Sequence, residues 1–304
     1  MGGGTYSACA FRDYSTSCGR TYTATGRIEN HQYTAIKLHP DMNPKDKIRE
    51  CCNSEEHPNT IPVILALDVT GSMGKACHEV ASTLSQIMET LYNKFKDIEV
   101  MIAGIGDFEC DRYPLQVSQF ESDVRIAKQL DNLFIEHGGG GNKYESYTSI
   151  WWFGLYRTKL DCYDQQGRKG IIITMGDEPI NPILPKSMLD YVGDLKKKQR
   201  DYEFETDKLY ELVKKKFDIF HISVNDPESS YDEDEEVDKS FQDVIGQNYK
   251  VSTINKLKDT ICECISQSVN DSASAQSIPN FDFTTEPITG DSRIKRDENG
   301  GIVW

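Results

Sequence analysis

Apolar residues recur along the chain with two different spacings, and these spacings predict an alternation of strands and helices. Near-continuous apolar runs are typical of strands that are buried on both faces of a parallel sheet. Such runs occupy residues 61–68, 99–106, 169–177 and 217–224. After the first of them, apolar residues from Val80 to Phe95 recur every three or four positions, which predicts an amphipathic helix. Strands that alternate with helices in this way predict a doubly wound, mainly parallel α/β sheet.

The remaining segments complete this expected α/β fold. Residues 115–120 form a second extended piece close behind the strand at 99–106, so we expect the two to pair antiparallel at an edge of the sheet. Further helices are expected at residues 123–134, 147–160, 186–216, 241–247 and 254–268, with a short strand at 249–252. Near the N-terminus, weak alternation at residues 21–25 and 32–37 predicts a hairpin around Gly26.

Composition divides the chain into three parts. Residues 1–57 are rich in Gly, Thr and Tyr, residues 58–268 carry the alternating strands and helices, and residues 269–304 are polar with few apolar residues. We therefore predict one α/β domain with an N-terminal and a C-terminal extension, the latter either a tail or a strap laid over the domain. The acidic run at residues 232–236 lacks the glycine and the ligand spacing of a calcium loop, which favours a solvated acidic loop.

Charge and cysteine content disfavour several classes of function. The 304-residue chain carries 34 Lys and Arg against 49 Asp and Glu, and its formal charge of -15 disfavours binding to nucleic acid. The 9 cysteines, an odd number at irregular spacing, favour reduced thiols over disulfides and match no zinc motif. Because the sequence has neither a signal-peptide pattern nor an apolar run long enough to span a bilayer, we expect a cytoplasmic protein without a membrane partner.

Oxygen-bearing side chains follow two of the expected strands. Asp68, Thr70 and Ser72 alternate through the turn after the first strand, and Asp177 ends the strand at 169–177. Because the carboxyl ends of parallel strands meet at one edge of a sheet, we expect these groups to lie close together. Carboxylates and hydroxyls suit a small, hard cation such as Mg²⁺. The alternative is that these side chains cap the helices that follow their strands.

The turn Asp68-Val-Thr-Gly-Ser-Met73 resembles the metal-ion-dependent adhesion site (MIDAS) of von Willebrand factor A (VWA) domains, which reads Asp-x-Ser-x-Ser. Thr70 keeps the hydroxyl of the Ser that it replaces. The resemblance covers residues 58–268 and implies a Rossmann-like VWA fold. It also implies that Asp177 is a further ligand of the metal, which is Mg²⁺ or alternatively Ca²⁺ or Mn²⁺.

A third loop of interest precedes the aromatic-rich helix expected at 147–160. In VWA domains a Thr in a glycine-rich loop at this place is the middle metal ligand, whereas here the glycines at 138–141 are followed by Glu145 and Ser146. By position, the resemblance implies that Glu145 or Ser146 is the substitute. A carboxylate would tighten metal binding and weaken the attraction for an acidic ligand. The predicted metal ligands are therefore Asp68, Thr70, Ser72, Glu145, Ser146 and Asp177.

The resemblance implies a non-enzymatic binding module whose metal engages an acidic side chain of a protein partner. Intracellular members of the family resemble partners of AAA-type ATPases or components of larger complexes, and the wider sequence resembles an uncharacterised bacterial and phage-associated subgroup. Two alternatives stay open: a structural subunit of a phage-like or defence-related assembly, and a Mg²⁺-dependent hydrolase. Against the hydrolase, the 6 His are scattered and Lys143 does not lie in a phosphate-loop motif. We therefore expect no enzymatic activity.

Overall fold

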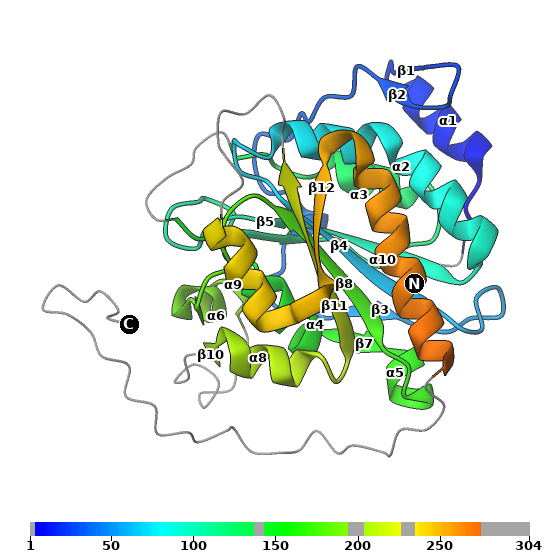
Figure 1. Cartoon of the computed structure of the whole chain (residues 1–304). Helices are drawn as coiled ribbons and strands as arrows, with labels where there is room; N and C mark the ends of the chain where they lie inside the picture. The colour runs from blue at the N-terminus through cyan, green and yellow to red at the C-terminus, as the bar shows by residue number, and fades with distance from the viewer. Residues whose placement is uncertain (1–3, 137–142, 194–203, 226–234, 275–304) are drawn as a thin grey trace, which may run out of the picture.

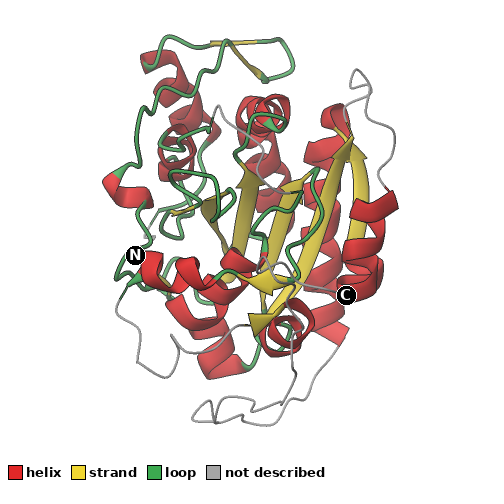
Figure 2. Ribbon diagram, turned by 90° about the vertical axis from the view of Figure 1, so that its left-hand side faces the viewer, coloured by secondary structure: helices red, strands yellow, loops and turns green. Residues whose placement is uncertain are grey.

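A six-stranded sheet forms the centre of the molecule and is covered by helices on both faces (Figures 1 and 2). The computed structural model describes residues 4–136, 143–193, 204–225 and 235–274. The strands of the sheet, in spatial order, are β12 (Tyr249–Thr253), β11 (Phe217–Asn225), β8 (Gly170–Gly176), β4 (Ile61–Asp68), β5 (Ile98–Ile105) and β6 (Leu115–Val117). Neighbouring strands are parallel except for β6, which pairs antiparallel with β5.

The order of these strands determines where a ligand would bind. Read from β6 to β12 and numbered by their sequence order within the sheet, the strands follow the doubly wound order 3-2-1-4-5-6. The chain builds outward from β4 to β5 and β6, then crosses over and builds in the other direction from β8. Loops therefore diverge at the carboxyl ends of β4 and β8, and doubly wound folds bind ligands at this point. The predicted doubly wound, mainly parallel sheet with one antiparallel edge strand is confirmed.

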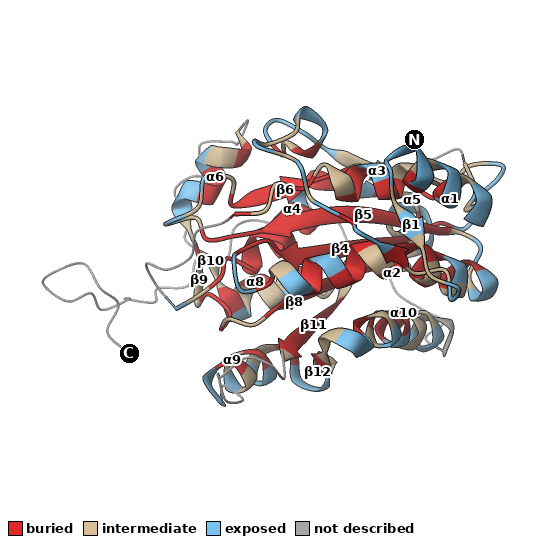
Figure 3. Cartoon of the chain, turned by 90° about the horizontal axis from the view of Figure 1, so that it is seen from above, coloured by how far each residue is buried: buried red, intermediate tan, exposed pale blue. Residues whose placement is uncertain are grey.

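Burial on both faces explains why the central strands read as continuous apolar runs. Along β4, Val63, Leu65 and Leu67 join one core cluster, and Ile64 and Ala66 join the other. The first cluster is completed by α1 (Ala8–Ser17), α2 (Gly74–Lys94), α3 (Arg125–Asp131) and α10 (Leu257–Ser274). The second is completed by α4 (Thr148–Arg157), α5 (Asp161–Gln166), α6 (Lys186–Val192), α8 (Thr206–Val213) and α9 (Glu235–Ile245). From above, the buried sheet lies between these two partly exposed helical layers (Figure 3).

The N-terminal segment packs against the α/β domain along much of its length. Phe11 of α1 and Met42 of η1 (Pro40–Met42) belong to the same core cluster as α2. Strand β3 (Arg49–Cys51) pairs in parallel with β7 (Thr158–Leu160), which follows α4. Asp131, the last residue of α3, accepts hydrogen bonds or ion pairs from Tyr14, Arg20 and His31. The predicted division at residues 57 and 268 stays a prediction.

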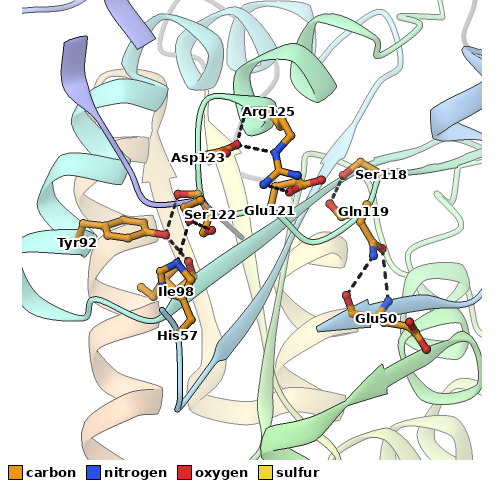
Figure 4. Close-up of polar contacts among 11 residues, drawn as sticks. Glu50, His57, Tyr92, Ile98, Ser118, Gln119, Glu121, Ser122, Asp123 and Arg125 are labelled. Carbon is orange, nitrogen blue, oxygen red and sulfur yellow. Dashed lines mark hydrogen bonds and ion pairs between the residues drawn. The ribbon is translucent and has the colours of Figure 1, made fainter. Parts of the chain in front are cut away.

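A polar network joins the start of the chain to the edge of the sheet near β5, where His57, Tyr92 and Ser122 gather (Figure 4). His57 Nε2 donates to the carbonyl oxygen of Gly4 at 2.8 Å, and the Ser122 hydroxyl donates to the same oxygen. The Tyr92 hydroxyl lies 2.8 Å from the carbonyl oxygens of both Ile98 and Ser122. A side chain on residue 4 would meet the Asp123 carboxylate, so glycine at this position lets the chain pass close to Asp123.

The predicted hairpin around Gly26 is present, but its second arm is shorter and earlier than expected. β1 (Thr21–Tyr22) pairs antiparallel with β2 (Ile28–Glu29), and Gly26 adopts a φ of +81° in the turn. This tight turn places residues 28–29 opposite β1, so residues 32–37 do not form the second arm.

Several helix boundaries also differ from the prediction. The helix expected at 147–160 ends at Arg157, because residues 158–160 form the strand that pairs with β3. The helix expected at 186–216 is divided into α6 and α8 by a small hairpin of β9 (Ile183–Leu184) and β10 (Phe204–Glu205). The helices expected at 241–247 and 254–268 run instead from 235 to 245 and from 257 to 274.

Some predicted features fall outside the described residues. These are the glycines at 138–141, the middle of the charged region at 194–203, most of the acidic run at 232–236 and the C-terminal residues 275–304. The last two residues of the acidic run, Glu235 and Glu236, lie in the first turn of α9. Within the described ranges, no helix combines the length and the apolar character needed to cross a membrane.

Candidate metal centre

Asp68 is the buried centre of the candidate site. As the last residue of β4 it is fully buried, and its Oδ1 accepts two hydrogen bonds from Thr70, from the backbone N–H at 2.9 Å and from the hydroxyl at 2.6 Å. These bonds close a tight turn directly after the strand, and α2 begins at Gly74 without a side-chain cap. The helix-capping alternative for Thr70 and Ser72 is therefore wrong: the Thr70 hydroxyl faces Asp68, and the Ser72 hydroxyl faces a different loop.

Asp177 brings the second loop to the same place. It directly follows β8, the strand next to β4, and its Oδ1 accepts a hydrogen bond from the Ser72 hydroxyl at 3.1 Å. The two residues are 105 positions apart in the sequence. Asp177 does not cap the next helix either, because α6 begins at Lys186 with no side-chain cap. The loops after β4 and β8 thus meet where the sheet order predicts a binding site.

The third loop, before α4, is held against the loop that follows β8. Glu145 exchanges backbone hydrogen bonds with this loop: its N–H donates to the carbonyl of Pro179 at 3.2 Å, and its own carbonyl accepts from the N–H of Asn181 at 3.3 Å. The Ser146 hydroxyl oxygen accepts from the backbone N–H of Phe108 at 3.3 Å, which links this loop to the one after β5. Both Glu145 and Ser146 are buried.

The carboxyl groups of the site repel one another, and Asp68 and Glu145 are buried while Asp177 is half-buried. Burial, followed by repulsion from Asp177, raises the pKa of Asp68 to about 7, although hydrogen bonds from Thr70 oppose this rise. Burial also raises the pKa of Asp177. Burial and then the charge of Asp68 raise the pKa of Glu145 to about 10. Near neutral pH, therefore, the site without a cation retains protons on carboxyl groups that would be ionised in water.

These residues fit a hard divalent cation. They offer carboxylate and hydroxyl oxygens, which are the donors that Mg²⁺ and Ca²⁺ prefer. The Oε2 atom of Glu145 is buried and has no hydrogen-bond partner among the described residues. Nothing in this part of the chain offsets the loss of its hydration, and a bound cation would do so. Within the same residues, no three His, Cys, Asp or Glu side chains are grouped closely enough to hold a metal ion by themselves. Hydroxyls and water would have to complete the shell, as Mg²⁺ commonly requires.

Asp107 and Asp111 lie near this site on the turn after β5, and their charges add to the rise in the pKa of Glu145. Both carboxylates also accept hydrogen bonds from their own turn. Asp111 Oδ2 accepts from the N–H of Asp107 at 2.7 Å, and Asp107 Oδ1 accepts from the N–H of Glu109 at 3.0 Å. They shape the turn and increase the negative charge around the candidate centre.

One residue of the site escaped the sequence-based prediction. Tyr147 was expected only as the start of an aromatic helix, yet its hydroxyl donates to Asp68 Oδ2 at 3.1 Å. A glycine immediately before Asp177 is the one signal in the sequence for this contact, because a side chain at Gly176 would collide with the Tyr147 hydroxyl.

Comparison with known proteins gives matches at the level of structure only. The sequence matches no protein-family model and no curated protein. In structure it is similar to the open conformation of the pilus adhesin SpaC from Lactobacillus rhamnosus GG, with a TM-score of 0.47 and 12% identity over 75% of this chain. It spans only 31% of that adhesin. It is also similar to the vWF domain of a type V pili tip protein from Porphyromonas gingivalis, with a TM-score of 0.46 and 10% identity over 73% of this chain and 99% of that domain.

The fold is a doubly wound, Rossmann-like α/β fold. The mainly parallel sheet and its antiparallel edge strand agree with the fold that the resemblance of the Asp68 turn implies. The structure also brings Asp68, Ser72 and Asp177 together across the carboxyl ends of adjacent strands. The assignment of metal ligands stays a prediction.

Proposed function

We propose that this chain is a VWA-type binding module that uses a divalent metal, Mg²⁺ in the first instance, to engage a protein partner. The observation that carries the proposal is the hydrogen bond from Ser72 to Asp177 beside the buried Asp68. It joins two loops at the point where doubly wound folds bind ligands. Neither Ser72 nor Asp177 caps the helix that follows its strand, so their convergence supports a role in binding.

Asp68, Ser72 and Asp177 would hold the metal directly or through water. Thr70 contributes by holding Oδ1 of Asp68, with both its N–H and its hydroxyl as donors. A bound Mg²⁺ would offer an open coordination position to an acidic side chain of the partner. The two carboxylates of Asp68 and Asp177 balance the charge of a divalent ion. The occupied site then has a net charge near zero, so it does not repel an acidic side chain of the partner.

Glu145 is the better supported of the two candidates for the middle ligand. Its carboxyl group lies within the electrostatic influence of Asp68, whereas the Ser146 hydroxyl is turned to the backbone of Phe108. Without a metal, burial and the charge of Asp68 raise the pKa of Glu145 to about 10, so its carboxyl group holds a proton that a bound cation would displace. Loss of that proton would bind the metal more tightly and weaken the attraction for an acidic partner.

A non-enzymatic role agrees with the state of the histidine that packs against Tyr147. His221 is fully buried in β11, and burial lowers its pKa well below the ordinary value, so it carries no charge. Its Nδ1 is hydrogen-bonded to the Thr174 hydroxyl at 2.9 Å and its ring stacks on Phe241 at 3.5 Å. A ring enclosed in this way supports packing better than it supports proton transfer to a substrate.

Partner capture with and without metal tests the proposal. The immobilised full chain is exposed to native extract in Mg²⁺ or in EDTA, and an AAA-type ATPase is the first partner to look for on the strength of the resemblance. We expect at least one protein to be retained only in Mg²⁺ and to be lost with Asp177→Asn. Asp190→Asn, at an exposed position on α6, serves as the matched control and retains the partner. Retention of every partner by Asp177→Asn in EDTA would refute a metal-dependent mode.

A further inference from the structure

Tyr147 connects the candidate metal centre to the core of the domain. The residue is fully buried just before α4, and its hydroxyl donates a hydrogen bond to Asp68 Oδ2 at 3.1 Å. Its ring packs edge-on against His221, with 5.0 Å between ring centroids, and against Phe241 at 5.5 Å. These contacts and the full burial of the ring restrain it, so the hydroxyl has little freedom to move.

The hydroxyl reaches Asp68 only because Gly176 leaves room for it. A Cβ atom at Gly176 would lie 1.8 Å from the Tyr147 hydroxyl oxygen, which no real side chain tolerates. The backbone N–H of Glu178 donates a hydrogen bond to the same oxygen. One hydroxyl group therefore bridges the carboxylate at the end of β4 and the turn after β8 that carries Asp177.

The bonds to Asp68 are divided between its two oxygens. Thr70 supplies both donors to Oδ1, and these are local to the turn. Tyr147 supplies the hydrogen bond to Oδ2 and comes from a different loop. Without it, Oδ2 would lose its hydrogen bond from the protein, and the carboxylate plane would be set by the local turn alone.

We propose that Tyr147 is a positioning residue of the candidate metal centre, whose hydroxyl orients the Asp68 carboxylate and holds it in register with the turn of Asp177. This inference rests on the proposed function, because it assigns to Tyr147 a contribution to metal affinity. Outer partners that orient a metal ligand are typically worth about 10- to 100-fold in affinity. Packing alone does not require the hydroxyl, since a phenylalanine would fill the same space between His221 and Phe241.

Mn²⁺ binding to the full-length Tyr147→Phe variant, measured by titration calorimetry and by the electron paramagnetic resonance of free Mn²⁺, tests the inference. We expect the dissociation constant to rise by about 10- to 100-fold relative to wild type. Tyr92→Phe is the matched control, because it also removes a buried hydroxyl, which here bonds the carbonyl groups of Ile98 and Ser122 (Figure 4). Ile98 begins β5, and Asp68 pairs with the other end of that strand. Tyr92→Phe should lower the urea midpoint in EDTA but leave the Mn²⁺ dissociation constant unchanged.

Gly176→Ala provides a second test, because it keeps the hydroxyl but removes the space that the hydroxyl occupies. It should weaken Mn²⁺ binding in the same direction as Tyr147→Phe.

If wild type binds Mn²⁺ and Tyr147→Phe binds it equally well, the positioning role is overturned while the metal centre stands. If wild type binds no Mn²⁺, both the metal centre and the role of Tyr147 are wrong. If both Tyr→Phe variants weaken binding by the same factor, the effect is one of general stability and the inference is also overturned.

Discussion

Replacing Glu145 by Gln should stabilise the metal-free protein and weaken its response to metal. Glu145 is 8% exposed and its Oε2 lacks a hydrogen-bond partner among the described residues. Burial and the charge of Asp68 raise its pKa from 4.5 to about 10. A group whose pKa is higher in the folded state binds its proton more tightly there, so folding loses stability as the pH rises above the pKa of the unfolded chain.

The size of the effect follows from this difference in pKa. Each pH unit above the unfolded value of 4.5 lowers the free energy of unfolding by about 1.4 kcal/mol until the folded value is reached. At pH 7 this amounts to about 3 kcal/mol for Glu145 alone. Repulsion is shared with Asp68, which also takes up a proton near neutral pH, so we expect Glu145→Gln to gain about 1–3 kcal/mol at pH 7. Well below pH 4.5 the gain should vanish, because the carboxyl group is then largely protonated in both states.

Urea unfolding in EDTA at about pH 5, 7 and 8, followed by circular dichroism, measures this gain. Addition of Mn²⁺ should then raise the free energy of unfolding of wild type more than that of Glu145→Gln, because the variant replaces a candidate carboxylate ligand by a neutral amide. An equal response to Mn²⁺ would instead favour Ser146 as the middle ligand. A gain that does not grow with pH, or a variant less stable than wild type at pH 8, would refute the reasoning from burial and charge.

Two further predictions concern the scaffold around the site. Lys216 is 6% exposed, and its ammonium group donates to three backbone carbonyls at the end of α4 at 2.7–3.2 Å. Lys216→Met should therefore lower the free energy of unfolding by about 2–4 kcal/mol. A loss below about 0.5 kcal/mol in urea unfolding would contradict this. The Asp131 carboxylate pairs with Arg20 and with His31 at 2.8 Å each. Asp131→Asn should therefore speed proteolytic cleavage within residues 4–57 while the α/β domain stays folded. Unchanged cleavage kinetics would show that apolar packing holds this segment without the ion pairs.

Strands and one long helix could be predicted because their burial imposes a pattern on the sequence. The run from Ile61 to Asp68 matches β4, since a central strand of a doubly wound sheet is apolar on both faces. The repeat that begins at Val80 belongs to α2, whose one buried stripe gives helical spacing. Such patterns are local, and they determine the type of element without reference to its partners.

The sequence pattern did not predict the secondary structure of segments that pair with a distant part of the chain. Residues 158–160 continue a helical pattern, but they form β7 because β3 from the N-terminal segment pairs with them. The short second arm of the first hairpin has a similar cause, since the conformation of Gly26 sets the register. Local preferences of about 1 kcal/mol per residue are readily outweighed by pairing with a strand from another part of the chain.

For the candidate site, the local sequence pattern was enough to predict which oxygen groups stand at the ends of β4 and β8, because strand ends and turn residues follow from that pattern. It did not determine that Ser72 would bond Asp177, or that Tyr147 would reach Asp68 past Gly176. Those contacts depend on how three loops pack against one another in space. The raised pKa of Glu145 could not be predicted from the sequence either. A carboxyl group keeps its ordinary pKa until the tertiary structure buries it away from water and places other acidic side chains beside it.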